Sequence, residues 1–448
     1  MSPATRHGLG EPTRRAYAQE AAFPQFSDLR ESGWRKLARA CHRGDMLGIR
    51  GDRLFDGVAD HYLADPVVLV DQGAIVAVER LDNARRAVEV VDLGDVTLLP
   101  GLIDSHSHLV LDASDDPVGH ITTSDDEVVL EHCRSAARAA LQAGITTVRD
   151  LGDRGYLTLT LREELKADPS TGPELLVAGP PITPTGGHCW FLGGEADGVE
   201  GVRQAVRDHG ARGVDLIKVM VTGGEITPGS VPYLSQYGPD ELRAIAEEAH
   251  AHGLRVTGHA HGAQGVADAV AAGFDGIEHA TFMTADGVRH DPDLFNDMAA
   301  RRIFVSVPIA SAAVQPSPPP GSSVAKRFTA ILAGLQTMRA AGVAITVSSD
   351  AGIAETKPHD VLPHGVAQIA RIGFSNADAL RSVTSVAAES CGLGSRKGRI
   401  APGYDADLLA VRGDPLTDPS DLRNVAAVFR AGEPIRRPAL RERPLAYG

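Results

Sequence analysis

Two histidines separated by one residue follow an apolar segment in Leu98–Pro–Gly–Leu–Ile–Asp–Ser–His–Ser–His108. Side chains at positions i and i+2 of a β-strand point to the same face, so His106 and His108 can bind one metal ion from a rigid backbone. The carboxyl group of Asp104, two residues earlier, lies on the same side. Since the chain has 17 histidines in 448 residues, about 0.6 such pairs arise by chance. The motif is therefore a hypothesis that needs support from other segments.

The His-x-His pattern occurs three times, at His106/His108, His250/His252 and His259/His261. The second pair lies in Pro239–Gly253, whose apolar spacing and closing glycine predict an amphipathic helix. Positions i and i+2 of a helix point about 200° apart, so His250 and His252 cannot chelate one ion. We expect them at the solvated carboxyl end of that helix, where positive charge suits the helix dipole.

Strand-like and helix-like segments alternate along most of the chain. Eight β-strands are predicted at Leu99–Ser105, Thr146–Asp150, Glu174–Ala178, Leu216–Val221, Arg255–His259, Gly276–His279, Ile303–Val307 and Val343–Ser349. Several intervening helices are predicted to end at glycines, namely Gly144, Gly253, Gly273 and Gly342. Eight such units predict an α/β fold of the (β/α)8 TIM barrel type. A doubly wound open sheet is the alternative, but no Gly-x-Gly-x-x-Gly motif follows the first strand.

Short β segments separated by turns occur near both ends of the chain. They are Met46–Arg50, Pro66–Val70, Ala74–Val78, Val88–Val91, Val96–Pro100, Asp407–Val411 and Ala426–Arg430. We therefore expect a small β-sandwich domain built from residues 46–100 plus 400–448, with the barrel in residues 101–399. Residues 1–45 are polar and irregular, and we interpret them as an N-terminal extension with one helix around Asp28–His42.

Polar residues stand where the predicted strands end, and in a barrel these ends share one rim, where barrel enzymes carry their active sites. They are His106, His108, Lys218, His259, His261, His279 and Asp350. Alone, His279 would more often be a structural histidine and Asp350 a turn or helix-capping residue. Lys218 is harder to explain, because an ammonium group in an apolar strand is costly unless it is paired, neutralised or modified. Convergence on one rim favours a functional site.

The polar residues belong to longer motifs. These are Pro100–Gly–Leu–Ile–Asp–Ser–His–Ser–His108, Ile217–Lys–Val–Met–Val–Thr–Gly–Gly224, Gly258–His–Ala–His–Gly262, Gly276–Ile–Glu–His279 and Ser348–Ser–Asp–Ala–Gly352. Together they resemble the amidohydrolase superfamily of binuclear metal hydrolases, and within it the imidazolonepropionase-like or Xaa-Pro dipeptidase-like branch. The resemblance covers about residues 46–435, including the tail from Gly398 to Leu409, and implies the same barrel and β-sandwich.

The resemblance implies a set of metal ligands. His106 and His108 would bind the more buried metal ion together with Asp350. His259 and His279 would bind a second ion. A mononuclear site that uses only part of this set remains an alternative.

The resemblance also implies that Lys218 is carboxylated by CO2 and bridges the two ions, which explains a lysine in an apolar strand. Two divalent ions about 3.5–4 Å apart would share a hydroxide, which attacks a carbon–nitrogen bond. Asp350 would take the proton and deliver it to the leaving nitrogen. Zinc is the expected metal, although manganese, iron or cobalt suit the same ligands. His261 is not required as a ligand. We assign it either to the residues that support the metal ligands or to substrate binding.

Residues that bind substrate are less strongly indicated. His188, in Thr185–Gly–Gly–His188, resembles a family segment near the site and would hydrogen-bond the scissile carbonyl or a substrate carboxylate. An incidental histidine in a glycine-rich turn is the alternative. Tyr237 is a candidate of similar standing. Trp190 and Phe191 replace the polar residues expected in prolidase-like relatives, and they would suit an apolar substrate group.

Two further features have structural interpretations. Arg149 and Asp150, at the end of the second barrel strand, are interpreted as an internal ion pair. Pro308–Ser323 is long for a barrel loop, and its content of proline, serine and glycine suggests a mobile lid. A disordered insertion explains this segment equally well.

Composition excludes several classes of partner. The net charge of −14 and the lack of a Lys/Arg cluster argue against nucleic acid and against an anionic membrane surface. No apolar stretch approaches the ~20 residues of a membrane span, and the N-terminus lacks a signal-peptide core. The cysteines are scattered, which favours a reducing, cytoplasmic location. We expect a small-molecule substrate, and homo-oligomerisation is left open.

The sequence thus predicts a binuclear metal-dependent hydrolase that cleaves an amide-type carbon–nitrogen bond in an N-acyl amino acid, a dipeptide or a cyclic amide. A heterocycle deaminase on the same barrel is the first alternative, which the bridging lysine at position 218 argues against. A catalytically inactive scaffold protein is the second, but such relatives lose metal ligands, whereas every expected position is filled here.

Overall fold

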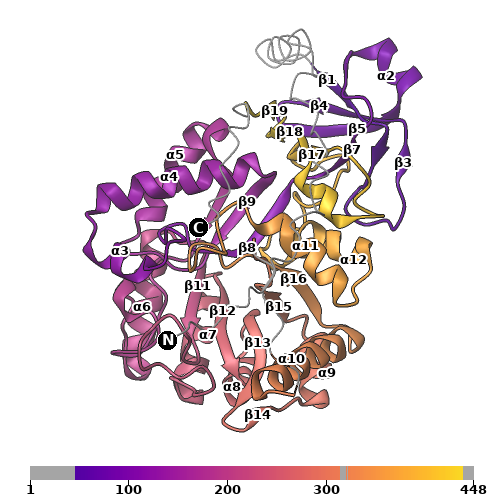
Figure 1. Cartoon of the computed structure of the whole chain (residues 1–448). Coiled ribbons are helices and arrows are strands. Elements are labelled where there is room, and N and C mark those ends of the chain that lie inside the picture. Colours follow the sequence, from indigo (N-terminus) through magenta and orange to yellow (C-terminus); the bar gives the residue numbers. More distant parts are fainter. Residues whose placement is uncertain (1–45, 313–318, 320, 437–448) are drawn as a thin grey trace, which may run out of the picture.

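The computed structural model describes residues 46–312, 319 and 321–436 (Figure 1). The first strands of this part form a four-stranded sheet. Its order is β5-β4-β1-β6. The strands are β1 (Leu47–Arg50), β4 (Pro66–Asp71), β5 (Ala74–Arg80) and β6 (Glu89–Asp92), with helix α2 (Leu81–Ala87) between the last two. Strand β1 pairs antiparallel with β4 and parallel with β6, so this sheet is mixed.

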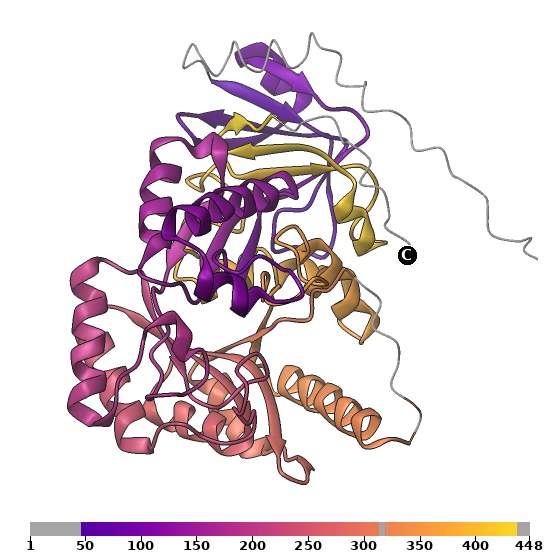
Figure 2. The same ribbon diagram turned by 60° about the vertical axis from the view of Figure 1, so that its left-hand side comes forward.

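A six-stranded sheet combines segments from both ends of the described chain, in the order β19-β18-β17-β7-β2-β3. Its strands are β2 (Arg53–Leu54), β3 (Leu63–Ala64), β7 (Thr97–Pro100), β17 (Leu408–Val411), β18 (Val425–Arg430) and β19 (Glu433–Pro434). Indigo and yellow strands therefore lie side by side in Figures 1 and 2. One cluster of buried side chains includes Ile49 of the first sheet with Leu98 and Phe429 of the second.

The remaining strands are parallel and fall into two groups. The first group is β10-β9-β8, from β8 (Leu102–Ser107), β9 (Ile145–Asp150) and β10 (Glu174–Val177). The second is β11-β12-β13-β15-β16, from β11 (Leu216–Met220), β12 (Arg255–Gly262), β13 (Gly276–Thr284), β15 (Phe304–Val307) and β16 (Ala344–Val347). Strand β14 (Gly287–Val288) forms a hairpin with β13. The predicted α/β fold with parallel strands is confirmed.

Isolated bridges connect the two parallel groups at both of their outer edges. Ile182, beyond β10, pairs with Val219 of β11, and Ser107 of β8 pairs with Ala351, beyond β16. Both bridges are parallel. At the second junction the N–H of Asp350 donates to the carbonyl of His106 at 2.7 Å. These contacts bring the segment after β10 against β11, and the end of β8 against the segment after β16.

Helices lie between successive parallel strands, and the last three follow β16. They are α3 (Pro117–Thr123), α4 (Asp126–Gln142), α5 (Leu157–Ala167), α6 (Gly198–Arg212), α7 (Pro239–Ala251), α8 (Ala263–Ala272), α9 (Pro292–Ala300), α10 (Ser323–Ala340), α11 (Leu362–Arg371), α12 (Asn376–Arg381) and α13 (Ser385–Ser390). Three short 3-10 helices are η1 (Pro169–Thr171), η2 (Trp190–Leu192) and η3 (Pro419–Arg423). In the described part of the chain, no helix has the length and apolarity that a membrane crossing requires.

The helix that carries the second His-x-His pair ends where the sequence predicts. Helix α7 buries Leu242 and Ile245, its last turn contains His250, and His252 is its C-cap. The His250 ring lies 2.9 Å from the carboxylate of Asp275, at the far end from the histidine cluster described below. Neither histidine belongs to the two groups of potential metal ligands found among the described residues.

The first predicted barrel strand is divided in the structure. The sequence predicts one strand over Leu99–Ser105, whereas β7 ends at Pro100 in the six-stranded sheet and β8 begins at Leu102 in the parallel group. Gly101 lies between them, where a Cβ atom would come within 2.1 Å of Oγ1 of Thr146. Only glycine permits this close approach of the backbone to β9, so Gly101 marks the transition between the two sheets.

Some predictions concern segments outside the described residues. The helix expected around Asp28–His42 is one of them, and so is most of the central part of Pro308–Ser323. The short strands β2, β3, β14 and β19 were not predicted, because runs of two residues carry no periodic pattern.

Candidate metal centre

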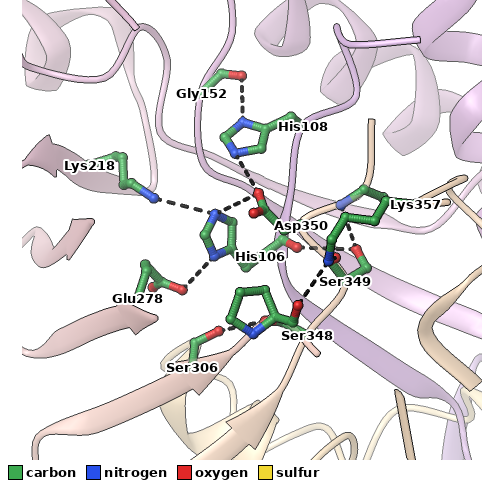
Figure 3. Close-up of polar contacts among 12 residues, drawn as sticks. His106, His108, Gly152, Lys218, Glu278, Ser306, Ser348, Ser349, Asp350 and Lys357 are labelled. Atoms are coloured by element: carbon green, nitrogen blue, oxygen red, sulfur yellow. Dashed lines mark hydrogen bonds and ion pairs between the residues drawn. The ribbon is translucent and has the colours of Figure 1, made fainter. Parts of the chain in front are cut away.

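His106 and His108 project from the carboxyl end of β8 toward the same carboxylate (Figure 3). The Nε2 atoms of both rings lie 3.3 Å from Oδ1 of Asp350, which follows β16. All three side chains are buried. The prediction that this histidine pair faces one side is therefore confirmed. Three potential ligand atoms, one from each residue, lie within 4.8 Å of one another.

The backbone of Asp350 has a left-handed conformation, with φ of 53°. Aspartate is one of the few residues that tolerate this region, and here it turns the carboxylate toward the histidines. The residue before it, Ser349, is held by Asp104, whose carboxylate accepts hydrogen bonds from the N–H and the hydroxyl of Ser349. Asp104, which the sequence places on the side of His106, thus supports the loop that carries Asp350.

Glu278 of β13 fixes the orientation of the His106 ring. Its Oε2 atom lies 2.9 Å from Nδ1 of His106, which leaves Nε2 directed at Asp350. His108 is arranged similarly, because its Nδ1 atom lies 3.3 Å from the carbonyl oxygen of Gly152. Partners of this kind on the far nitrogen select the ring tautomer that presents a lone pair to a metal ion.

The other oxygen of Glu278 binds Arg149 and Thr257. Oε1 lies 3.0 Å from Nη2 of Arg149 and accepts a 2.6 Å hydrogen bond from Oγ1 of Thr257. Burial opposes ionisation of Glu278, but Arg149 and His106 outweigh it and hold its pKa below the usual range. The predicted ion pair between Arg149 and Asp150 is wrong. Asp150 instead accepts hydrogen bonds from the N–H groups of Leu109 and Gly152.

Lys218 of β11 is fully enclosed beside the first histidine. Its Nζ atom lies 3.5 Å from Nε2 of His106, and within the described residues it forms no ion pair with a carboxylate inside 4.0 Å. Burial lowers the pKa of the Lys218 ammonium group from its ordinary value. A buried cation without a paired anion is the puzzle that the sequence raised, and the fold places it next to the metal-type ligands.

A second group of histidines lies beside the first. The rings of His259 and His279 are 4.5 Å apart between centroids, and His261 stacks on His279 at 4.3 Å. The potential ligand atoms of the three residues lie within 4.8 Å of one another. The rings of His279 and His106 are 5.3 Å apart, so the two groups adjoin.

Hydrogen bonds orient the second group as well. Nε2 of His259 lies 3.1 Å from the carbonyl oxygen of Gly223, which leaves its Nδ1 atom available. Nδ1 of His261 lies 3.0 Å from Oγ1 of Thr281. His279 has a left-handed φ of 71° at the point where β13 passes the cluster. Histidine is moderately tolerant of this region, and such backbone strain is often found at functional sites.

Four imidazoles of the site are held neutral. Burial is the main cause that lowers the pKa of His106 and of His261 to about 4, and it lowers the pKa of His259 and His279 well below the usual value. Neutral imidazole is the form that binds a metal ion. A set of neutral imidazoles, a carboxylate and an unpaired buried lysine fits divalent metal ions of the zinc type.

His188 is brought next to the second group, with its ring 4.7 Å from that of His259. It is buried, and burial is the main cause that lowers its pKa to about 3. Its Nδ1 atom has no hydrogen-bond partner among the described residues. A Cβ atom on Gly224 would come within 2.2 Å of Nε2 of His188, so this position needs glycine. The ring therefore retains unused hydrogen-bonding capacity beside the cluster.

Among the described residues, the hydroxyl of Tyr237 makes no contact with the histidines of the site. The hydroxyl donates to the carbonyl of Ala196 at 2.7 Å, and the side chain is buried. The preceding residue, Gln236, accepts a 2.7 Å hydrogen bond from the N–H of His188. Trp190, in η2, is 48% exposed. The two loops that follow β10 and β11 are thus tied together, and an exposed indole lies two residues from His188.

Sequence reasoning missed two charged residues of the site, Glu278 and Lys357. Glu278 lies in the same motif as His279, and a fully buried glutamate in an apolar strand is a signal comparable to that of Lys218. Lys357 donates to the carbonyls of Pro308 at 2.8 Å, Ala310 at 3.1 Å and Ser349 at 2.7 Å. No local sequence pattern predicts a role for Lys357, because its three hydrogen-bond partners are backbone carbonyls of two different loops.

Comparison with known proteins agrees with this geometry. Ochratoxinase of Aspergillus niger is 27% identical over 384 residues, which cover 77% of this chain and 76% of the relative. Imidazolonepropionase of Chromobacterium violaceum is 27% identical over 378 residues, which cover 75% of this chain and 82% of the relative. A solved structure of a Xaa-Pro dipeptidase with bound methionine in its active site is 27% identical, with a TM-score of 0.76 over 88% of this chain and 100% of that chain.

The family match covers most of the chain. Residues 97–435 match the model of the amidohydrolase family. This range contains all the candidate metal ligands, namely His106, His108, Lys218, His259, His261, His279 and Asp350. The predicted resemblance is confirmed. The chain therefore belongs to the amidohydrolase family, and it is a hydrolytic enzyme of the kind that acts on carbon–nitrogen bonds.

Proposed function

We propose that the protein is a binuclear metal-dependent hydrolase that cleaves an amide-type carbon–nitrogen bond in an N-acyl amino acid, a dipeptide or a cyclic amide. The observation that carries this proposal is the pair of adjoining ligand groups, His106/His108/Asp350 and His259/His261/His279, with the unpaired Lys218 next to the first. The names of the relatives, an ochratoxinase, an imidazolonepropionase and a Xaa-Pro dipeptidase, support hydrolysis of amide-type bonds.

In this proposal each ligand group holds one ion. His106, His108 and Asp350 hold the first ion, and His259 and His279 hold the second. Zinc is the expected metal for such ligands. When bound, two divalent ions acidify a water molecule and polarise the substrate carbonyl.

In this proposal the neutral amine of Lys218 would add CO2 and release a proton, and the carboxylated lysine would be a further anionic ligand for the metal ions. Its lowered pKa supports the reaction, since the neutral amine is the form that attacks CO2. Carboxylation also converts a buried cation into an anionic ligand, which removes the cost of its burial.

The chain's own residues carry out the proton transfers and the positioning. Asp350 takes a proton from the attacking water and delivers it to the leaving nitrogen. His188 donates a hydrogen bond to the substrate carbonyl or carboxylate, for which its unused Nδ1 atom is available. His261 borders the same space, and Glu278 keeps Nε2 of His106 directed inward. Tyr237 would contact substrate only with its aromatic ring, because its hydroxyl already donates a hydrogen bond to the carbonyl of Ala196.

We propose further that the eight parallel strands form one (β/α)8 barrel. The isolated bridges at Ile182/Val219 and Ser107/Ala351, which join the two strand groups at both edges, support closure. The remaining strands would form a β-sandwich over residues 46–100 plus 400–448, supported by the shared buried cluster of the two sheets. This arrangement places the candidate metal centre at the carboxyl ends of the strands, where barrel enzymes act.

Metal analysis of the purified protein tests the binuclear assignment. We expect about two divalent ions per chain, and expect the Lys218→Ala variant to lose most activity on N-acyl amino acids, Xaa-Pro dipeptides or lactams. Lys326→Ala, at an exposed lysine on α10, serves as the matched control. Short carboxylic acids should restore part of the activity of Lys218→Ala, because they can occupy the space of the bridging carboxylate. Full activity of Lys218→Ala, or wild-type protein without bound metal, contradicts the proposal.

The same assays separate the two alternatives. A deaminase releases ammonia from a heterocycle, whereas cleavage of an N-acyl amino acid or dipeptide releases a carboxylate and an amino acid. A scaffold protein neither binds stoichiometric metal nor turns over any of these substrates.

A further inference from the structure

A cavity of about 570 Å³ opens at the end of the parallel strands opposite to the histidine cluster. Its wall includes Arg255 and Phe304, which begin β12 and β15, and Asp275, which precedes β13. The cluster, by contrast, lies at the carboxyl ends of the same strands. The volume is within the range of about 300–1,000 Å³ that is typical of small-molecule sites. The proposed hydrolase reaction makes no use of this space.

Arg255 is a cation without an anionic partner in this wall. Its Nη1 atom donates to the carbonyl oxygens of Glu389 at 3.0 Å and Ser390 at 3.1 Å. Within the described residues, its guanidinium forms no ion pair with a carboxylate inside 4.0 Å, and Nε and Nη2 make no hydrogen bond. A guanidinium group presents five N–H donors in a planar fork that matches carboxylate and phosphate. Arg255 therefore has unused N–H donors and a positive charge that no carboxylate compensates.

The carboxylates of the wall are already engaged. Glu389 forms ion pairs with Arg302 at 2.9 Å and with Arg399 at 3.3 Å. Asp275 accepts a hydrogen bond from the N–H of Val256 at 2.8 Å and contacts His250 at 2.9 Å. Arg301 also lines the cavity, but it forms an ion pair with Asp297 at 3.0 Å. Arg255 therefore supplies the uncompensated positive charge of this wall, which favours an anion even though the whole chain is acidic.

Two adjacent backbone N–H groups are unpaired on the same wall. Gly394 and Ser395 both line the cavity, and among the described residues their N–H groups donate to no other group. Successive free N–H groups in a turn form concave anion-binding surfaces. They line the same cavity as Arg255, and backbone amides and arginine can share an anionic ligand.

We propose that this cavity binds a small molecule through a phosphate or carboxylate group, with Arg255 as the principal cation and the Gly394–Ser395 backbone as the second contact. The proposal goes beyond the hydrolase function and does not depend on it. It concerns a separate site at the opposite end of the strands.

Thermal unfolding of the full chain with added anions tests the proposal. Inorganic phosphate and malonate are the two probes, and sodium chloride at the same ionic strength is the reference. A ligand that binds only the folded state raises Tm, and we expect a rise of about 2 °C or more over the chloride reference with one probe. A rise with phosphate assigns a phosphate ligand, and a rise with malonate assigns a carboxylate ligand.

Two variants locate the binding. Arg255→Gln retains a hydrogen-bond donor for the carbonyls of Glu389 and Ser390 but removes the charge. Ser395→Glu introduces a carboxylate that competes for Arg255, and it decides the matter if the first variant does not fold. We expect both to abolish the rise in Tm. Arg339→Gln is the matched control, because Arg339 also donates to a backbone carbonyl, that of Gly373 at 2.6 Å, but does not line the cavity.

Phosphate can also bind at a metal centre, so Asp350→Asn is included to separate the two sites. We expect this variant to keep the anion-dependent rise in Tm. The proposal is overturned if neither probe raises Tm above the chloride reference, if Arg255→Gln keeps the rise, or if Asp350→Asn loses it while Arg255→Gln does not.

Discussion

The carboxylate of Glu278 and the imidazole of His106 are in direct contact, with Oε2 of the one 2.9 Å from Nδ1 of the other. The residues belong to β13 and β8, which are not neighbours in either parallel group. Glu278 therefore reaches across the interior to set the ring of a residue on another strand. Because Arg149 lies against its other oxygen, Glu278 remains ionised even though it is fully buried.

The Glu278→Gln variant should bind metal about 10–100-fold more weakly and lose activity in parallel, which is the usual effect of removing a partner of a ligating histidine. A glutamine amide is nearly the same size, but it cannot act as a charged acceptor for the proton on Nδ1. Metal content after dialysis against graded chelator, measured with kcat, checks this. Glu433→Gln, at an exposed position of β19, is the control. Wild-type metal retention in Glu278→Gln would show that the contact is only structural.

The Lys357→Met variant should destabilise the fold and slow catalysis. Removing the ammonium group leaves the carbonyls of Pro308, Ala310 and Ser349 without a donor, which costs about 2–4 kcal/mol in total. Ser349 adjoins Asp350, so kcat should fall as well. Urea unfolding and steady-state kinetics measure the two effects. Lys326→Met, on the exposed part of α10, should match the wild type, and equal behaviour of both variants would contradict this role.

Acid should weaken the contact between β10 and the loop that precedes β17. Burial opposes ionisation of Glu174, but Arg396 and Lys397 outweigh it and lower its pKa from 4.5 to about 2. A group with a depressed folded-state pKa stabilises the fold above its unfolded pKa, and this contribution is lost as the pH falls. The stability that Glu174 provides should therefore disappear between about pH 4.5 and pH 2.

Glu174→Gln checks this directly. The variant should be less stable than the wild type near neutral pH by roughly 3 kcal/mol at most, and its free energy of unfolding should fall less steeply through the acid range. Urea unfolding of both proteins at several pH values gives the comparison. Parallel curves for the two proteins would rule out a contribution from the lowered pKa of Glu174.

Trp190→Ala should weaken binding of substrates that carry an apolar group and leave small substrates unaffected. Trp190 is 48% exposed two residues from His188, so its indole ring can pack against an apolar group of a substrate bound beside His188. We expect KM to rise about tenfold for a substrate with an aromatic or branched group, equivalent to about 1.4 kcal/mol. Val76→Ala, at a 40% exposed residue of β5, is the control. A uniform change for all substrates would argue against a specificity role.

The histidines and Asp350 could be predicted because their positions follow from strand ends, and strand ends follow from local periodicity. The alternation of strands and helices predicted the parallel α/β fold in the same way. Lys218 was conspicuous because its charge conflicts with its apolar neighbours.

The partners of these residues could not be predicted. Arg149 was assigned to its chain neighbour Asp150, whereas the fold gives it to Glu278, which lies far along the sequence. Such pairs depend on how strands pack across the interior, and this is not encoded in any short window of residues. The division of the first strand at Gly101 was missed for a similar reason, since it is caused by the approach of Thr146.

The antiparallel pairing of β7 with β17 has a consequence for synthesis of the chain. Leu408 lies opposite Pro100, so the ribosome must add about 300 residues before β7 acquires this partner. At elongation rates of about 5–20 residues per second, the edge of β7 stays unpaired for roughly 15–60 s. During translation the edge of β7 that later pairs with β17 is therefore exposed, and prone to aggregation, while the intervening α/β region is synthesised and folds.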